Sequence, residues 1–131
     1  VRFLSRCPAS RHAQNALPMK KLRWKNWLAP AFYYLAILSI SLIPRSGVEK
    51  VDRLIPLPND KVLHLGVYSG FGFVLGRLPF SPVALGMAGS LLGALDEQVQ
   101  RLAPGRDVSV ADWVADILGV SLGLAVRRRQ R

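Results

Sequence analysis

Acidic side chains are absent from most of this chain. The first 48 residues, the segment 61–95 and everything after Asp116 contain none. The eight acidic residues fall in two short windows: Glu49, Asp52 and Asp60, then Asp96, Glu97, Asp107, Asp112 and Asp116. Each window borders an apolar segment. If these segments cross a bilayer, both windows lie on the same side and form one polar, titratable patch at one end of a helical bundle.

Other functional signals are also scarce. Cys7 is the only cysteine, so the chain has no disulfide framework, and its position in the N-terminal arm excludes it as a nucleophile of the core. No glycine-rich loop precedes a Lys-Ser or Lys-Thr pair, which excludes a phosphate-cradling loop of that type. The core holds a single histidine, His64. We therefore expect no cofactor and assign no metal site.

Apolar residues, by contrast, make up half of the chain and are gathered into blocks. Four blocks are nearly free of charge: Trp27–Pro44, Val62–Gly76, Leu78–Leu95 and Val110–Val126. An 18-residue helix is about 27 Å long, close to the hydrocarbon thickness of about 30 Å. Four such blocks in 131 residues leave too little polar surface for a soluble domain. The pattern predicts an all-α polytopic membrane protein, a bundle of four transmembrane helices.

The net charge of +10 is distributed unevenly about these blocks. In the predicted topology twelve basic residues flank one side: Arg2, Arg6, Arg11, Lys20, Lys21, Arg23, Lys25, Arg77, Arg127, Arg128, Arg129 and Arg131. Six face the other: Arg45, Lys50, Arg53, Lys61, Arg101 and Arg106. The positive-inside rule then places both termini in the cytoplasm of a cell-membrane protein. We interpret the basic ends as topology signals and contacts to membrane lipid, and expect no nucleic-acid partner.

Helix boundaries follow from prolines and capping residues. We expect helices at about 24–43, 60–77, 80–102 and 109–126, within one membrane domain at 19–126. Pro56 and Pro58 predict that residues 45–59 form an outer loop. Residues 1–18 are expected to be a disordered or non-native extension, and 127–131 a basic cytoplasmic tail. The first apolar block is expected to be an anchor rather than a removed signal, because no cleavage-site pattern follows it.

His64 and Asp116 are the sharpest candidates for chemistry. Asp60 and His64 share a helix face at i, i+4, although an acid at a helix start also has an ordinary capping role. Three roles remain open for His64: general base, metal ligand or neutral packing residue. Only ten residues follow Asp116 in its block, so it lies below the outer interface and must be protonated or paired with a cation. Asp112 resembles the last position of a capping box that starts at Ser109.

A second group lies at the end of the third predicted helix. Asp96 and Glu97 occupy the helix terminus that disfavours acids, so capping does not explain them. Glu97 and Gln100 share one face, and Arg106 follows the Pro104-Gly105 turn. Arg106 is expected to fork onto Glu97, Asp112 or Asp116, or onto a ligand phosphate or carboxylate. A purely structural ion-pair network is the alternative.

These residues resemble the two signatures of the VanZ-like membrane family. The first is Asp60-Lys61-x-x-His64, followed by Tyr68 and Gly72. The second comprises Asp96-Glu97-x-x-Gln100, Pro104-Gly105-Arg106, Asp112, Gly119 and Gly123. The similarity covers about residues 27–126, with one departure: the family usually has Asn where this chain has Asp116. The resemblance implies an integral membrane protein of the cell envelope. The founding member is linked to low-level teicoplanin resistance, and the family's molecular activity is unassigned.

Three functions remain open from the sequence. The first is an outward-facing intramembrane site that binds an envelope ligand, such as a lipid-linked precursor or a glycopeptide-like compound. Its expected ligand-binding residues are Asp60, His64, Asp96, Glu97, Gln100, Arg106, Asp112 and Asp116. The second is an intramembrane enzyme acting on a lipid-linked envelope substrate, with His64 or Glu97 as general base and Arg106 holding an anion. A divalent cation bridging Asp60, His64, Glu97 and Asp112 is a variant of this site. The third is a small proton or ion pathway, for which a homo-oligomer is required.

Overall fold

The computed structural model describes residues 24–130, which form five helices. They are α1 (Lys25–Ser41), α2 (Arg45–Leu54), α3 (Asp60–Leu75), α4 (Pro82–Gln100) and α5 (Val110–Arg129). The expected all-α class is confirmed. The expected extension at residues 1–18 lies outside the described part of the chain.

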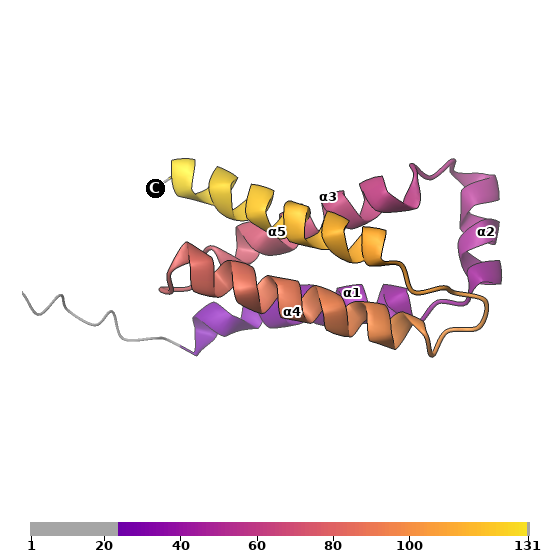
Figure 1. Cartoon of the computed structure of the whole chain (residues 1–131), viewed down its shortest axis with the longest axis horizontal. Helices are drawn as coiled ribbons and strands as arrows, with labels where there is room; N and C mark the ends of the chain where they lie inside the picture. Colours follow the sequence, from indigo (N-terminus) through magenta and orange to yellow (C-terminus); the bar gives the residue numbers. More distant parts are fainter. Residues whose placement is uncertain (1–23, 131) are drawn as a thin grey trace, which may run out of the picture.

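The four long helices run side by side along the length of the molecule, and α2 lies across one end (Figure 1). The start of α1, the α3–α4 turn and the end of α5 lie at the opposite end (Figure 1). All eight acidic residues come from α2, from the starts of α3 and α5, or from the end of α4 and the loop after it. The fold therefore gathers them at the α2 end, which we call the acidic end.

The expected outer loop at 45–59 is wrong, because its first ten residues form α2. Pro56 and Pro58 follow this helix and limit it only at its C-terminus. Pro44 occupies the N-cap position, where a proline does not disrupt the helix. Five of the ten residues of α2 are charged, so the segment does not form a charge-free apolar block in the sequence. The last helix also continues to Arg129, so most of the predicted tail is helical.

Side-chain caps explain where three of the four long helices start, namely α3, α4 and α5. The side chain of Asn59 accepts a hydrogen bond from the backbone N–H of Lys61, and Ser81 accepts one from Ala84. Ser109 accepts one from Asp112 at the start of α5. Each cap satisfies a backbone donor that the helix itself leaves free.

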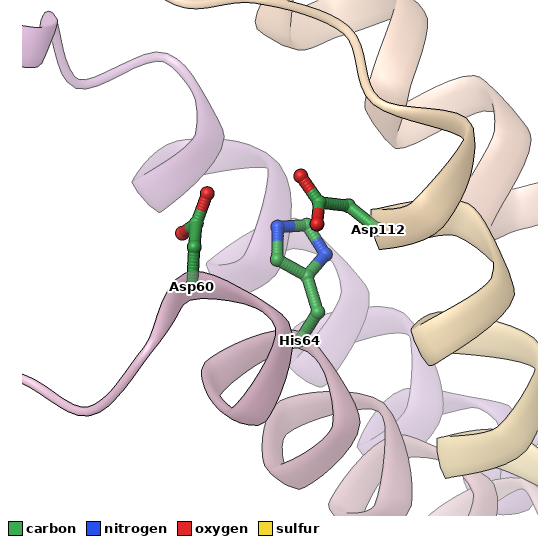
Figure 2. Close-up of side chains that lie close together, drawn as sticks. All are labelled: Asp60, His64 and Asp112. Atoms are coloured by element: carbon green, nitrogen blue, oxygen red, sulfur yellow. The ribbon is translucent and has the colours of Figure 1, made fainter.

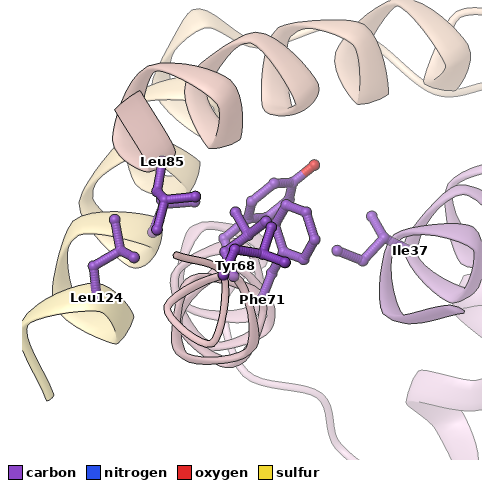
Figure 3. Close-up of a cluster of buried hydrophobic side chains, with 8 residues drawn as sticks. Ile37, Tyr68, Phe71, Leu85 and Leu124 are labelled. Atoms are coloured by element: carbon purple, nitrogen blue, oxygen red, sulfur yellow. The ribbon is translucent and has the colours of Figure 1, made fainter. Parts of the chain in front are cut away.

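Glycines allow α3 and α5 to pack with their backbones close together. A Cβ atom on Gly119 would lie 2.6 Å from the carbonyl oxygen of Leu65, and one on Gly123 would overlap the carbonyl oxygen of Ser69. Small residues at such crossings let helices approach closely. Beside this contact, Tyr68 and Phe71 of α3 lie between Ile37 of α1 and the leucines of α4 and α5 (Figure 3). This apolar cluster lies between the acidic end and the opposite end, where α5 closes with Arg127, Arg128 and Arg129.

Within residues 24–130, no single helix combines the length and apolarity of a full membrane span. Helices α1 and α2 meet the requirement as a pair, with a 97° bend at the break between them.

Candidate functional site

Three helices bring buried polar side chains together at the acidic end. The positions come from the first two turns of α3 and α5 and from the last two turns of α4, because these helices pack side by side. The buried members of this polar cluster are His64, Asp96, Glu97, Gln100, Asp112 and Asp116. All of them were ligand-binding candidates from the sequence. Their convergence in a protein interior is unusual, because buried charge is costly unless it is paired.

His64 stands at the centre of this polar cluster. Its Nδ1 atom lies 2.8 Å from Oδ1 of Asp116, which has no exposed surface, and 3.9 Å from Oε1 of Glu97. The contact to Asp116 is a hydrogen bond, and the contact to Glu97 is too long to be one. Gly93 makes room for Asp116, since a Cβ there would lie 3.1 Å from Oδ2 of that carboxylate. The imidazole therefore links α3 to α5 directly, with a carboxylate of α4 beside it.

Asp112 lies on the more accessible side of His64. Figure 2 shows its carboxylate reaching from α5 toward the imidazole ring, with Asp60 on the first turn of α3. Oδ1 of Asp112 forms an ion pair of 3.2 Å with Nζ of Lys61, whose side chain is half exposed. Asp60 itself is exposed. The hydrogen bond that caps the start of α3 is accepted by the side chain of Asn59 rather than by that of Asp60.

The expected capping box at Ser109 is only half formed. Ser109 Oγ accepts a hydrogen bond from the backbone N–H of Asp112, as expected. The reciprocal acceptor is not Asp112 but Glu97, whose Oε2 accepts from the backbone N–H of Ser109 at 3.1 Å. A carboxylate of α4 thus completes the cap of α5. This contact leaves the Asp112 carboxylate free to pair with Lys61.

Arg106 does not make the expected fork. Its Nη2 donates to Oε1 of Gln100 at 3.4 Å, and within residues 24–130 it forms no ion pair with Glu97, Asp112 or Asp116. Arg106 follows a turn at Gly105, whose φ of 74° is the left-handed conformation that favours glycine. From this turn its side chain reaches Gln100 at the end of α4. The guanidinium therefore retains unused donors.

Two adjacent cavities open at this end. The first, which we call the polar cavity, has a volume of about 430 Å³ and lies between α2, the start of α3 and the 101–109 loop. Its charged lining residues are Arg45, Glu49, Asp52, Asp60, Lys61, Arg106, Asp107 and Asp112. The second, the apolar groove, has about 320 Å³ between α1, α2 and α3, with His64, Tyr68 and Asp96 in its wall. The two share the side chains of Val48, Leu57, Asp60, Leu63 and Arg106.

Several oxygen atoms of the buried cluster have no hydrogen-bond partner. Among the described residues these atoms include Oε1 of Glu97, Oδ2 of Asp116, Oδ1 of Asp96 and Oη of Tyr68. Buried polar atoms are nearly always satisfied, so each exception needs an explanation. Gln100 Nε2 donates only a long hydrogen bond, of 3.4 Å, to the other oxygen of Asp96. Three of these four unpartnered atoms are carboxylate oxygens, which accept hydrogen bonds or bind cations.

The structure adds Lys61 and Tyr68 to the residues predicted for the site. Lys61 forms the ion pair with Asp112. Tyr68 lies in the wall of the apolar groove and is 1% exposed. Both residues belong to the Asp60-Lys61-x-x-His64 signature and its continuation, which was the signal that could have identified them. Nothing in their residue types alone indicated these contacts.

One serine pattern in α5 has no catalytic geometry. Residues 119–123 match the Gly-x-Ser-x-Gly spacing of serine hydrolases, which place the serine at a sharp turn between a strand and a helix. Here Ser121 lies inside a continuous helix, exposed, and its hydroxyl donates to the carbonyl oxygen of Ile117. The pattern reflects helix packing through its glycines.

Comparison with protein-family models, with curated proteins and with solved structures gives no match for this chain. The function therefore has to be argued from the geometry of the site.

Proposed function

We propose that this chain is an integral membrane protein of the cell envelope, of the VanZ-like type, that binds an envelope lipid at its acidic end. The four long helices have 16–20 residues, or about 24–30 Å, which is comparable to the hydrocarbon thickness of a bilayer. In the proposed arrangement the four long helices cross the bilayer with the acidic end on the outer side, and both termini are cytoplasmic. Helix α2 lies along the outer interface, where its charged face meets head groups and water.

The distribution of side chains supports a lipid environment. Large apolar residues occupy exposed rows with i, i+4 spacing along two helices. The α4 row is Val83, Met87, Leu91 and Leu95, and the α5 row is Val110, Val114, Leu118, Leu122 and Val126. Each is between 42% and 73% exposed. Exposed apolar rows around buried carboxylates reverse the usual pattern of soluble proteins, in which charged groups are almost never fully buried.

The ligand proposal rests on the adjacency of the polar cavity and the apolar groove, which share five lining residues. A ligand that fills both must be charged at one end and apolar at the other, because the shared wall leads from charged side chains to aliphatic ones. Membrane lipids have this chemistry and reach the groove laterally. The carrying observation is the shared wall formed by Val48, Leu57, Asp60, Leu63 and Arg106.

The charges of the polar cavity favour a phosphate-containing head group. Arg45 pairs with Glu49 and Lys61 pairs with Asp112, whereas Arg106 forms no ion pair in the described chain. A guanidinium with free donors binds phosphate in a bidentate manner. Carboxylates in the same cavity, including Asp107, suit an ammonium or hydroxyl group on the same head group. A lipid-linked envelope precursor or a zwitterionic phospholipid meets both requirements.

An intramembrane enzyme is the second candidate function. His64 lines the apolar groove, and its Nδ1 atom is hydrogen-bonded to Asp116, the arrangement that orients a histidine as general base through its other nitrogen. The substrate in this case is the lipid that the groove accommodates. A change in the mass of the bound lipid during incubation would identify this function.

Lipid retention by the purified full chain tests the proposal. The protein is extracted from membranes in mild detergent, incubated with phosphatidylethanolamine and phosphatidylglycerol, and examined by native mass spectrometry. We expect one lipid to remain bound to the wild type. Arg106→Gln should lower its occupancy several-fold, while Arg101→Gln, an exposed cation outside both cavities, should leave it unchanged.

The groove is tested by filling it. Ile40 is 57% exposed in the groove wall, and Leu118 is 58% exposed on α5 outside both cavities. Ile40→Trp should displace the lipid, whereas Leu118→Trp should not. A wild-type protein that retains no lipid, or equal retention in the two tryptophan variants, would show that the groove is not a lipid site.

A further inference from the structure

We propose that His64, Glu97 and Asp116 form a site for one divalent transition-metal cation inside the bundle. Each residue comes from a different helix: α3, α4 and α5. One ligand atom from each lies within 4.8 Å of those of the other two, and all three residues are buried. This set differs from the bridge expected from the sequence, which used Asp60 and Asp112 together with His64 and Glu97.

The unpartnered oxygens point to a bound cation. Oε1 of Glu97 and Oδ2 of Asp116 have no hydrogen-bond partner, although the residues are only 2% and 0% exposed. Both belong to the three-residue set that converges near His64. A carboxylate oxygen buried in this way normally has a donor or a cation. A metal ion supplies what both atoms lack.

The charge balance inside the bundle supports the same conclusion. Asp96, Glu97 and Asp116 bring three carboxyl groups to the buried cluster. Neither nearby base forms an ion pair with these three residues, since Lys61 pairs with Asp112 and Arg106 contacts only the neutral Gln100. His64 alone does not offset three carboxylates. A divalent cation between them restores the balance within the low-dielectric interior.

The donor types indicate which cations fit. One imidazole nitrogen and two carboxylate oxygens suit Mn²⁺, Fe²⁺ or Zn²⁺ better than Ca²⁺, which prefers a larger set of oxygens. Ligand atoms lie about 2.0–2.2 Å from Zn²⁺ and therefore at most about 4.4 Å from each other. Nδ1 of His64 lies 2.8 Å from Oδ1 of Asp116 and 3.9 Å from Oε1 of Glu97, both within this limit. An ion bound between these atoms takes the place of the hydrogen bond from His64 to Asp116. Three protein ligands leave coordination positions open toward water or a ligand in the adjoining groove.

The alternative group around His64 is less suitable. Asp60, His64 and Asp112 also lie within 4.8 Å of one another (Figure 2). Asp60 is exposed, however, and Asp112 already pairs with Lys61. Neither carboxylate contributes an unpartnered buried oxygen. The geometry therefore assigns the ion to the inner set, one helical turn deeper on α5.

Metal binding by the full chain in detergent tests this assignment. The protein is purified through an affinity tag without histidine, stripped with chelator and titrated with Mn²⁺ and Zn²⁺ by calorimetry. We expect about one equivalent to bind. Glu97→Gln and Asp116→Asn should each weaken metal binding by at least about tenfold. That is the smallest effect typical of losing a residue that only supports a metal ligand. Arg101→Gln, at an exposed position at the same end and outside both cavities, should bind as the wild type.

A spectroscopic measurement on the wild type avoids dependence on the folding of variants. Mn²⁺ bound at this site should show nitrogen hyperfine coupling from His64 in pulsed electron paramagnetic resonance, and the coupling should persist in His12→Ala, which removes the other histidine. Absence of metal uptake or of the nitrogen coupling would overturn the proposal. So would equal binding by well-folded Glu97→Gln and Asp116→Asn. No lipid is added and only metal uptake is measured, so these outcomes are distinguishable from those of the lipid-retention test.

Discussion

The Nδ1 atom of His64 lies 2.8 Å from Oδ1 of Asp116, and this hydrogen bond joins α3 to α5 where Asp116 has no exposed surface. The two residues are 52 positions apart in the chain. Both helices must therefore be packed in register before the contact forms. The contact explains how a carboxyl group is accommodated deep in an apolar bundle, and it places the imidazole in the wall of the apolar groove.

Replacing Asp116 should distinguish the loss of its hydrogen bond from the loss of its charge. Asp116→Leu leaves the buried imidazole without its partner and should lower the free energy of unfolding by about 1–3 kcal/mol. Asp116→Asn keeps a hydrogen-bonding group and should cost less. Thermal unfolding in detergent measures both. Asp107→Leu serves as an exposed control and should change stability by less than about 0.5 kcal/mol. Equal stability of Asp116→Leu and the wild type would mean that the hydrogen bond contributes nothing.

The close packing of α3 against α5 gives a second prediction. Gly123→Ala places a methyl group against the Ser69 carbonyl oxygen and the Phe73 backbone nitrogen, so the helices must separate. We expect a loss of about 1–3 kcal/mol in the free energy of unfolding. Gly66→Ala is the matched control in α3, since no atom lies within 4 Å of its added Cβ. It should be neutral or stabilising by up to about 1 kcal/mol. The reverse order of the two variants would contradict the helix packing described above.

The start of α5 gives a third prediction. Ser109→Ala removes the hydroxyl that accepts from the Asp112 backbone N–H, and should cost about 1 kcal/mol of unfolding free energy. Ser121→Ala removes a hydroxyl that only bonds back to Ile117 on the exposed face, and should have little effect. Chemical denaturation in detergent compares the two. The cap is unimportant if both variants unfold alike.

Gly105 gives a fourth prediction, which concerns the polar cavity. Its positive φ directs Arg106 toward Gln100, and a Cβ there would also lie 3.2 Å from Cβ of Arg45. Gly105→Ala should therefore cost about 1–2 kcal/mol and displace the guanidinium. Lipid retention should fall as it does in Arg106→Gln, as measured by native mass spectrometry. Retention at the wild-type level would show that the turn does not position Arg106.

Much of the architecture could be predicted from the sequence. Charge-free blocks located the four long helices, because an apolar run of that length has few alternatives to a buried or lipid-facing helix. The restriction of acidic residues to two windows placed them at one end of the molecule. The same reasoning brought His64, Glu97, Gln100 and Asp116 together, since each lies near the same end of its helix.

Other features depended on contacts that no local pattern encodes. Helix α2 was missed because its charged residues hide an apolar spacing of three, at Val48, Val51 and Leu54. Arg106 contacts Gln100 next to a left-handed turn at Gly105, and the sequence does not indicate which of several nearby polar groups it meets. Glu97 completes the cap of α5 from a different helix, so the exchange of roles with Asp112 appears only in the packed structure.

Labelling of single cysteines in intact bacterial cells tests the central claim that the acidic end lies outside a membrane crossed by the bundle. In a Cys7→Ser background, cysteine is introduced by Asp107→Cys at the acidic end or by Gln130→Cys at the opposite end, both at exposed positions. A membrane-impermeant maleimide should label Asp107→Cys in intact cells and Gln130→Cys only after lysis. Equal labelling of both positions before lysis, or the reverse pattern, would contradict the account.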